Sequence, residues 1–386
     1  MVFFGQTTRY IRYAVDCKEL PFTSRLDLIL TIIVHSATSP VSGFCWLLDE
    51  ILYGKRLNSL SVVEPLFVVS AYRSASTEMA RTLAKDAQRF AAPNAIMCAF
   101  PYLWLWKVIT WIVGDDSGIS AEEANGYLNK NFTKESLERH DNDHFAMDTF
   151  DGYFLSSHLN GLAFRLGPEV IIKEFNSAKF EECNRYLFEH CFVKHVDRIA
   201  RKTLLFNNGA TTASSSNSLD KTFLLKGHFL SSANALQRKY PDARFLAVLR
   251  DPLDRLRSGI NHTAVNATLW QGNSPRWDWL SKAFQEIEVE YCEREMQWYG
   301  NKGNINDDRN NHRLAVKFDA FVNNFNKTMK GVYRDLLEDD KLVPNFAPLA
   351  KVSKQYTVNK SLKELGVDQL ELKHQLDEYY AWMDKQ

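Results

Sequence analysis

The sequence predicts an α/β fold of three layers, in which helices flank a central parallel β-sheet and a helical extension precedes the sheet domain. Two distant stretches support this prediction, residues 65–79 and 245–258. Each begins with an apolar run of strand length, breaks at a polar turn that contains arginine, and continues with helical spacing. Such runs are typical of strands buried on both faces of a parallel sheet.

The first stretch predicts a strand over residues 64–70 and a helix over residues 77–90. Met79, Leu83 and Ala87 follow the polar turn at the spacing of one helix face. The turn itself therefore lies between the end of a strand and the start of a helix.

The second stretch repeats this order. It predicts a strand over residues 244–249, and Leu253, Leu256 and Ile260 then indicate a helix. A strand over 222–226 and a helix over 229–239 precede it, so this part of the chain reads as a right-handed βαβ unit. The remaining predicted elements are helices at 153–206, 278–300, 320–337 and 367–384, a last parallel strand at 313–318, and a mobile, low-complexity loop at 207–218.

Residues 1–60 are expected to form a helical extension. Pro40 is expected to break the helical pattern there, and a hairpin packed on the main domain is the simplest outcome. An interfacial anchor or a cover over an apolar acceptor site are the alternatives. The most apolar segment, residues 26–33, is too short to cross a bilayer and lies too far along the chain for a signal peptide. We therefore expect a cytoplasmic protein, with membrane contact through these helices as an alternative.

The composition argues against several classes of function. The formal net charge of the 386 residues is zero, which does not favour a nucleic-acid partner. The six cysteines form no Cys-x-x-Cys pair, so a zinc or redox motif is not expected. His140 and His144 have the spacing of two metal ligands on a helix, but a charged, solvated surface explains them as well, and no metal is expected.

An aromatic segment at residues 93–115 has two interpretations. It contains the large rings of Phe100, Tyr102, Trp104, Trp106 and Trp111. Core packing explains such rings. The alternative is a pocket for the acceptor of a reaction, because aromatic faces pack against ring-shaped ligands.

Both polar turns have the properties of an anion site. The first N–H groups of a helix have no partner within the helix, and the helix dipole favours negative charge there. Arg73 adds a positive fork, and Ser74, Ser76 and Thr77 add hydroxyl groups. The structural alternative is that these hydroxyl groups only cap the helix.

Taken together, the two turns resemble motifs of the sulfotransferases that use 3′-phosphoadenylyl sulfate (PAPS). R-S-A-S-T at residues 73–77 is similar to that family's R-[ST]-G-T-T phosphosulfate loop, and R-D-P-L-D-R-L-R-S at 250–258 is similar to its 3′-phosphate motif. Further similar runs follow the same order, from about residue 60 to the C-terminus. They are L-L-K-G-H at 224–228, Y-P-D-A-R-F at 240–245, A-V-K-F-D-A-F at 315–321 and S-L-K-E-L-G at 361–366.

This resemblance implies a P-loop-like sulfotransferase domain over residues 61–386, after the extension at 1–60. It implies PAPS as donor, and a small-molecule, lipid or carbohydrate acceptor with a hydroxyl or amine group. It also implies a set of donor-binding residues: Arg73, Ser74, Ala75, Ser76, Thr77, Arg250 and Ser258.

Three departures from the family pattern accompany these matches. Ala75 replaces the loop glycine, Glu78 stands where Leu or Trp is usual, and Met97 lies where a Trp-Glu pair often follows the first helix. A catalytically inactive nucleotide-binding relative is therefore one alternative. A small-molecule kinase is the other, although no Gly-Lys-[Ser/Thr] follows the turn.

Sulfuryl transfer needs a held donor, charge stabilisation at the leaving phosphate, and a proton acceptor for the attacking group. Arg73 and Lys226 are the expected charges. His228, two residues after Lys226, is the expected general base, because imidazole accepts a proton near neutral pH. A hydrogen-bonded structural histidine is the alternative reading of His228, and Glu78 is then the next candidate base.

Overall fold

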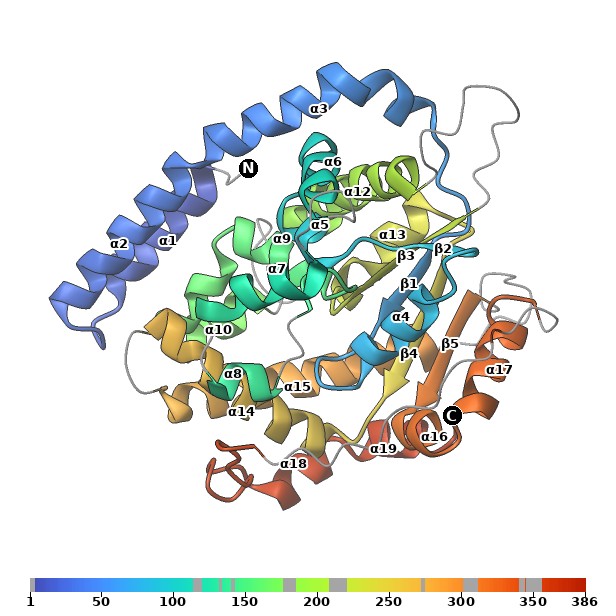
Figure 1. The fold of residues 1–386 in the computed structure, drawn as a ribbon. Coiled ribbons are helices and arrows are strands. Elements are labelled where there is room, and N and C mark those ends of the chain that lie inside the picture. Colours follow the sequence, from blue (N-terminus) through green and yellow to red (C-terminus); the bar gives the residue numbers. More distant parts are fainter. Residues whose placement is uncertain are drawn as a thin grey trace.

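The computed structural model describes residues 4–113, 120–131, 134–139, 143–175, 185–207, 221–271, 275–300, 312–339, 344 and 356–386. Among them a single five-stranded sheet has the order β2-β3-β1-β4-β5, and every strand pair is parallel. The strands are β1 (Leu66–Val69), β2 (Phe90–Ala91), β3 (Thr222–Gly227), β4 (Arg244–Leu249) and β5 (Arg313–Lys317). This sheet and its flanking helices confirm the predicted fold class (Figure 1). Strand β2 has only two residues and was not predicted.

Alternating side chains of the strands form a separate core on each face of the sheet. Phe67 and Phe245 point into one core, and Leu66 and Leu246 point into the other. The first face is covered by α12 (Phe192–Asn207), α13 (Ala233–Lys239) and α15 (Trp277–Gly300). The second face is covered by α4 (Ser76–Ala84) and α17 (Phe325–Asp335). The three predicted layers are therefore present.

The other helices mostly match the predicted segments. The segment 153–206 forms α9 (Phe150–Ser157), η2 (Asn160–Arg165), α10 (Pro168–Phe175), η3 (Leu187–Cys191) and α12, and the C-terminal segment forms α18 (Gln369–Gln375) and α19 (Asp377–Met383). The segment 320–337 forms α16 (Phe318–Asn323) and α17, and the second turn leads into α14 (Pro252–Gln271). Further short helices are α5 (Ala95–Ala99), α6 (Leu103–Ile112), α7 (Ala121–Leu128), η1 (Asn129–Asn131), α8 (Lys134–Arg139) and η4 (Leu230–Ser232). Most of the expected loop at 207–218 lies outside the described residues.

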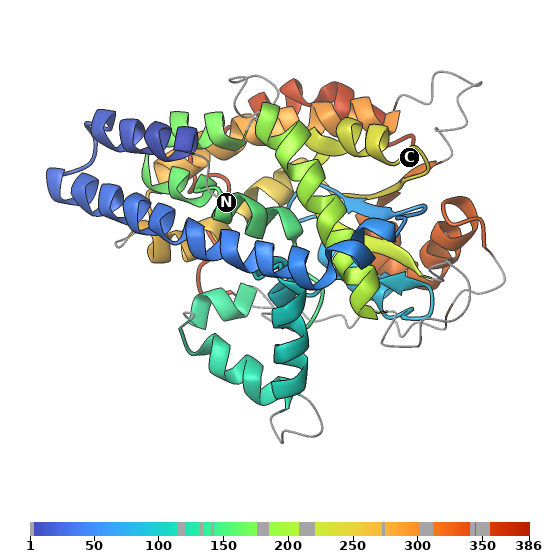
Figure 2. The same cartoon turned by 90° about the horizontal axis from the view of Figure 1, so that it is seen from above.

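The N-terminal extension is helical, as expected, but Pro40 does not break it. Helix α1 (Phe4–Asp16) packs on α2 (Phe22–Ala37), and α3 (Ser39–Ser59) continues the direction of α2 (Figures 1 and 2). Pro40 occupies the first turn of α3, where its missing N–H group costs no hydrogen bond, and Thr38 keeps a helical conformation.

The continuous helix corrects the expectation of a short apolar segment. Among the described residues, Phe22–Ser59 is long and apolar enough to cross a bilayer by length and composition, and little of its most apolar part is buried. The argument that the apolar segment is too short to cross a bilayer therefore does not apply to the whole helix, which is longer than residues 26–33. The division of the chain at residue 60 stays a prediction.

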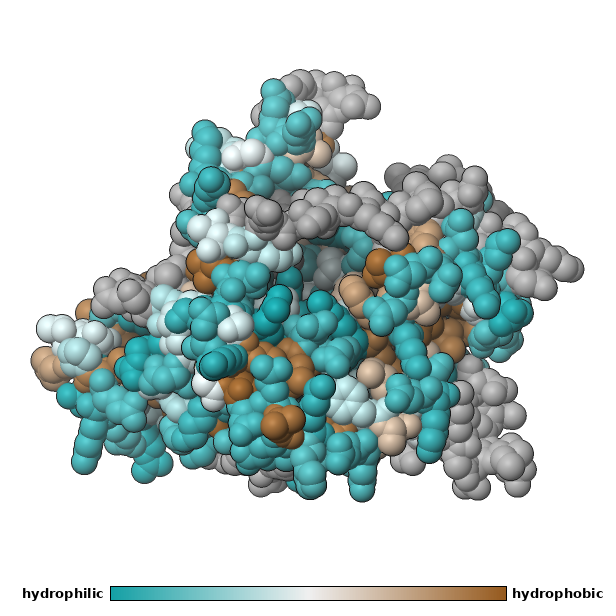
Figure 3. All heavy atoms as spheres, turned by 90° about the horizontal axis from the view of Figure 1, so that it is seen from below, coloured by the Kyte–Doolittle hydropathy of each residue, from teal (hydrophilic) through white to brown (hydrophobic). Residues whose placement is uncertain are grey.

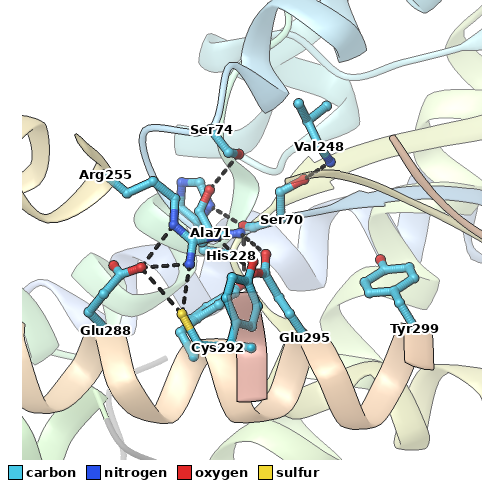
Figure 4. A network of polar contacts seen from close by, with 12 residues as sticks. Ser70, Ala71, Ser74, His228, Val248, Arg255, Glu288, Cys292, Glu295 and Tyr299 are labelled. Atoms are coloured by element: carbon cyan, nitrogen blue, oxygen red, sulfur yellow. Dashed lines mark hydrogen bonds and ion pairs between the residues drawn. The ribbon is translucent and has the colours of Figure 1, made fainter. Parts of the chain in front are cut away.

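Helix α15 determines where strand β1 ends. Tyr299 donates a hydrogen bond to the carbonyl of Val69 (2.9 Å), and Tyr291 donates one to the carbonyl of Ser70 (3.0 Å). The Glu295 carboxylate accepts the N–H of Ala71 at 3.1 Å. Successive turns of one helix thus bind three successive backbone units as they leave the sheet. Figure 4 shows Glu295 and Tyr299 on this helix, with Glu295 beside Ala71.

Glu295 is itself held by buried partners. Arg255 donates to its Oε2 at 2.7 Å, and the Tyr379 hydroxyl donates to the same oxygen at 2.7 Å. Arg255 also pairs with Glu288, and all three charged side chains are fully buried. Burial raises the pKa of Glu288, and the Arg255 charge opposes that shift. Removing one member of such a network leaves another buried charge without full compensation.

We therefore expect Glu295→Gln to lower the free energy of unfolding by about 3–5 kcal/mol, as measured by urea denaturation. The matched control is Glu293→Gln on the exposed side of the same helix, which should change stability by less than about 0.5 kcal/mol. A loss of similar size in both variants would show that the buried carboxylate does not support the loop.

Candidate functional site

The loop between β1 and α4 has an unusual backbone. Arg73 and Ala75 both adopt positive φ angles, 62° and 69°. The Ala75 carbonyl accepts the N–H of Met79 at 3.1 Å, so α4 begins directly after the loop. Left-handed conformations favour glycine, and the motif that this loop resembles has glycine at the position of Ala75. The chain reaches the same conformation with alanine.

The hydroxyl groups of the loop have different environments. Ser74 is fully buried and donates to the carbonyl of Ala71 at 2.7 Å, so its side chain closes the loop rather than facing the cavity. Ser76 and Thr77, at the start of α4, line the cavity together with Arg73 and Ala75. The Ser74 hydroxyl, which was predicted to bind the donor, is therefore already bonded to the Ala71 carbonyl within the loop.

The two polar turns meet in space. Arg73 donates from Nε to the Ser258 hydroxyl at 3.0 Å, and Arg250 donates to the Arg73 carbonyl at 2.9 Å. The guanidinium of Arg250 also lies 4.7 Å from the centre of the Phe318 ring. Residues about 180 positions apart in the chain are thus in direct contact at the carboxyl ends of β1 and β4, as open parallel sheets require of a ligand site.

Strand β3 brings a buried lysine to the same place. Lys226 is 2% exposed, lines the cavity, and donates to the hydroxyl of Thr149. Burial lowers the pKa of Lys226, while the carboxylates of Asp148 and Asp151 oppose that shift. Asp151 is held in turn by the N–H of His228 at 2.9 Å, and burial raises the pKa of Asp151.

His228 has one ring nitrogen fixed and the cavity beside it. Its Nδ1 lies 2.8 Å from the Ser70 carbonyl. A carbonyl oxygen can only accept, so Nδ1 carries the proton and Nε2 keeps its lone pair. Burial and the nearby Lys226 charge lower the pKa of His228 to about 3, against the opposing effect of the Ser70 carbonyl. The imidazole is therefore neutral at physiological pH.

These groups surround one cavity of about 720 Å³. It contains the predicted residues Arg73, Ala75, Ser76, Thr77, Lys226, His228 and Arg250. The cavity also has an aromatic wall, formed by Tyr153, Phe164, Phe175, Phe188 and Phe284. Cationic and anionic groups both reach it, with Arg81 and Arg294 adding to the cations, and Glu78, Asp148 and Asp151 as the carboxylates.

The aromatic segment expected to form an acceptor pocket takes no part in this cavity. None of the described residues between 93 and 113 lines it. Trp106 is buried in the core, whereas Phe100 and Trp111 are exposed. Core packing is the correct interpretation for Trp106, and the aromatic wall instead comes from α9, η2, α10, η3 and α15.

Sequence reasoning missed the carboxylates of Asp148 and Asp151. Asp148 precedes α9 and Asp151 lies in its first turn, and that pattern alone gave no reason to place them beside Lys226. Glu78 does line the cavity, whereas Met97 lies on α5 and packs against the core. His140 lies outside the described residues, and His144 Nε2 lies 3.0 Å from the Asn129 side chain. Within the described part of the chain, no group of three or more possible metal ligands occurs.

Known structures have the same fold. The chain is similar to the sulfotransferase STF9 from Mycobacterium avium, with a TM-score of 0.62 and 14% identity over 98% of this chain and 91% of that one. It is also similar to the sulfotransferase STF1 from Mycobacterium tuberculosis H37Rv, with a TM-score of 0.61 and 13% identity over 96% and 92% of the two chains. No curated protein sequence gives a significant match.

A protein-family model matches most of the sequence. Residues 65–339 match the model of the sulfotransferase family, and this range includes both polar turns and the five strands of the described sheet. The chain therefore belongs to the sulfotransferase family.

Proposed function

We propose that the protein transfers a sulfuryl group from PAPS to a hydroxyl group of an acceptor with an apolar body. The contact between the two anion turns carries this proposal, because Arg73 bonds Ser258 and Arg250 bonds the Arg73 carbonyl. One nucleotide with a 5′-phosphosulfate and a 3′-phosphate would need both turns at once. The resemblance of both motifs to those of PAPS-dependent enzymes supports the same donor.

The donor would be held by charge and by backbone N–H groups. Arg73 and the start of α4, with the Ser76 and Thr77 side chains, would bind the phosphosulfate. Arg250 and Ser258 would bind the 3′-phosphate. Lys226 would stabilise the negative charge that develops on the leaving phosphate, since it is a buried cation in the same cavity.

His228 would take the acceptor proton. The acceptor oxygen forms a bond to sulfur while the bond from sulfur to the phosphate oxygen breaks, and the hydroxyl proton moves to Nε2 of His228. The Ser70 carbonyl fixes the tautomer that leaves Nε2 free to accept this proton. Adenosine 3′,5′-bisphosphate then leaves with the electron pair of the broken bond.

The acceptor class follows from the aromatic wall. Phe164, Phe175 and Phe284 line the cavity beside the charged groups, so a flat or flexible apolar body fits there. A phenol, sterol or lipid alcohol matches this wall better than a polyhydroxylated sugar does. If the acceptor were an amine, His228 would take its proton in the same way.

Adenosine 3′,5′-bisphosphate should raise the melting temperature of the protein, because a ligand that binds only the folded state stabilises it. AMP should raise it much less, since AMP lacks the 3′-phosphate that Arg250 and Ser258 would bind. Differential scanning fluorimetry at matched concentrations measures both shifts. Equal shifts would exclude the assigned 3′-phosphate site, and Ser258→Ala should reduce the shift with the bisphosphate only.

His228→Ala and Lys226→Ala should each lower kcat by about 10²-fold or more. The affinity for adenosine 3′,5′-bisphosphate should change little in His228→Ala, because the base would contact the acceptor. In the wild type, a pKa of about 3 keeps His228 neutral, so His228 should cause no fall in kcat/KM between pH 7 and 5. Steady-state kinetics over this range test both points. Near-normal kcat in a folded His228→Ala variant would leave Glu78, Asp148 or Asp151 as the base.

Ala75→Gly should preserve or increase donor affinity and should not destabilise the protein. An L-residue in the left-handed region costs roughly 1–2 kcal/mol, and glycine avoids that strain at its own entropic cost. The control is Ala80→Gly within α4, which should destabilise by at least about 0.5–1 kcal/mol. Isothermal titration with adenosine 3′,5′-bisphosphate measures the affinity, and a collapse of binding in Ala75→Gly would mean that the side chain of Ala75 is itself required.

A further inference from the structure

One long helix has an apolar surface that the described part of the chain leaves uncovered. Helices α2 and α3 run through residues 22–59 as one helix. We define the apolar stripe as ten side chains of this helix that are each 47–72% exposed: Phe22, Leu26, Leu30, Ile33, Val34, Val41, Phe44, Leu47, Ile51 and Leu52. Together they far exceed the scattered exposed apolar residues of an ordinary surface.

The members of the apolar stripe lie on one side of the helix. Most successive members are three or four residues apart, which is the spacing of one helix face. At 1.5 Å per residue the stripe is about 45 Å long. By contrast, hydrophilic side chains predominate on the surface seen from below, with apolar residues only interspersed (Figure 3). The exposed apolar side chains of the stripe therefore run along one side of a single long helix.

The opposite side of the helix is fixed to the protein. Leu28 and Ile32 are buried against α1 and η2. Asp49 accepts the N–H groups of Leu103 and Trp104 at 2.7 and 3.0 Å, and it pairs with buried Lys202 at 2.8 Å. A helix held along both of its halves cannot cross a bilayer while the domain is folded on it, so the stripe can contact a membrane only by lying flat on it.

Helix α6 extends the apolar surface beside α3. It packs on α3 through its buried side (Figures 1 and 2). Its other side exposes Val108, Trp111 and Ile112, and Trp111 is 75% exposed. Tryptophan is enriched at the boundary between lipid and water, where its ring packs on acyl chains and its N–H reaches the headgroups.

The charges around this surface are mainly unpaired cations. Asp27, Asp49 and Glu50, the acidic residues of α2–α3, pair with Arg165, Lys202 and Arg198. Lys55, Arg56 and Lys107 lie exposed where α3 meets α6, and none of the ion pairs among the described residues involves them. Lys107 instead lies 4.5 Å from the centre of the Tyr53 ring. This charge pattern complements an anionic surface.

We propose that the apolar stripe and the exposed side of α6 bind the surface of an anionic lipid bilayer, with α2–α3 lying in the plane of the membrane. The apolar side chains enter the boundary of the acyl chains, and Lys55, Arg56 and Lys107 contact the headgroups. This surface is formed by residues outside the cavity, so the proposal does not depend on the sulfuryl-transfer reaction.

Flotation with lipid vesicles tests the proposal. The full chain is mixed with vesicles of phosphatidylcholine alone or of phosphatidylcholine with phosphatidylserine, and the fraction that floats is measured. The wild type should float with the anionic vesicles, and less with the neutral ones. The double variant Phe44→Glu/Ile51→Glu should lose at least about tenfold in affinity, because it places charge at the centre of the stripe. The matched control is Leu370→Glu, an exposed apolar residue on α18, which should float like the wild type.

Replacing Lys55, Arg56 and Lys107 by glutamine should weaken binding to the anionic vesicles by about fivefold for each cation, with little effect on the neutral ones. Failure of the wild type to float with either vesicle would overturn the proposal, as would equal flotation of Phe44→Glu/Ile51→Glu. Light scattering tests whether a second copy of the chain, rather than a membrane, covers the stripe. A dimer in solution that Phe44→Glu/Ile51→Glu dissociates would assign the stripe to a second copy of the chain and reject the membrane. Stabilisation by adenosine 3′,5′-bisphosphate should be equal in all variants, which separates this test from that of the donor site.

Discussion

The position of the loop between β1 and α4 depends on the buried carboxylate of Glu295. Its Oε1 accepts the N–H of Ala71, where β1 has just left the sheet, and its Oε2 is fixed by Arg255 and Tyr379. A charged acceptor bonds an N–H group more strongly than a neutral one does, and burial increases the cost of losing the bond. Because the Ser70 carbonyl next to this bond also orients His228, the network links the loop after β1 and the proposed base to the same helix.

The second motif therefore has two functions in the fold. Arg250 and Ser258 both contact Arg73, and Arg73 and Arg250 line the cavity. Arg255, between them in sequence, instead points away from the cavity and pairs with Glu288 and Glu295 of α15 (Figure 4). The segment from Arg250 to Ser258, at the start of α14, thus contacts Arg73 through two of its side chains and α15 through Arg255. This arrangement explains why two anion turns far apart in the chain can be held in register, since the segment that would bind the 3′-phosphate also supports the loop that would bind the phosphosulfate.

The sequence was sufficient to predict the features that depend on neighbouring residues, such as most strands and helices. Continuous apolar runs predicted four of the five strands, and both arginine-containing turns were predicted to follow strands of a parallel sheet. The contact between Arg73 and Ser258 itself was not predicted. The roles of these residues stay predictions. Pairings across the chain were not predictable: the bond from Ala71 to Glu295 spans 224 positions, and nothing local marks Asp151 as a partner of His228. The prediction that Pro40 breaks the helical pattern was wrong because proline disrupts only the interior of a helix. Pro40 lies in the first turn of α3.

The same network accounts for alanine at the position of the family's glycine. Arg73 and Ala75 both lie in the left-handed region, where each L-residue costs roughly 1–2 kcal/mol. Such strain persists when surrounding contacts determine the backbone, and the Glu295, Tyr291 and Ser74 bonds do so on the side of the loop nearest β1. The resulting conformation directs the start of α4 at the cavity. Glycine would reach that conformation without strain, so alanine here requires a rigid support, and the buried charges of α14 and α15 supply it.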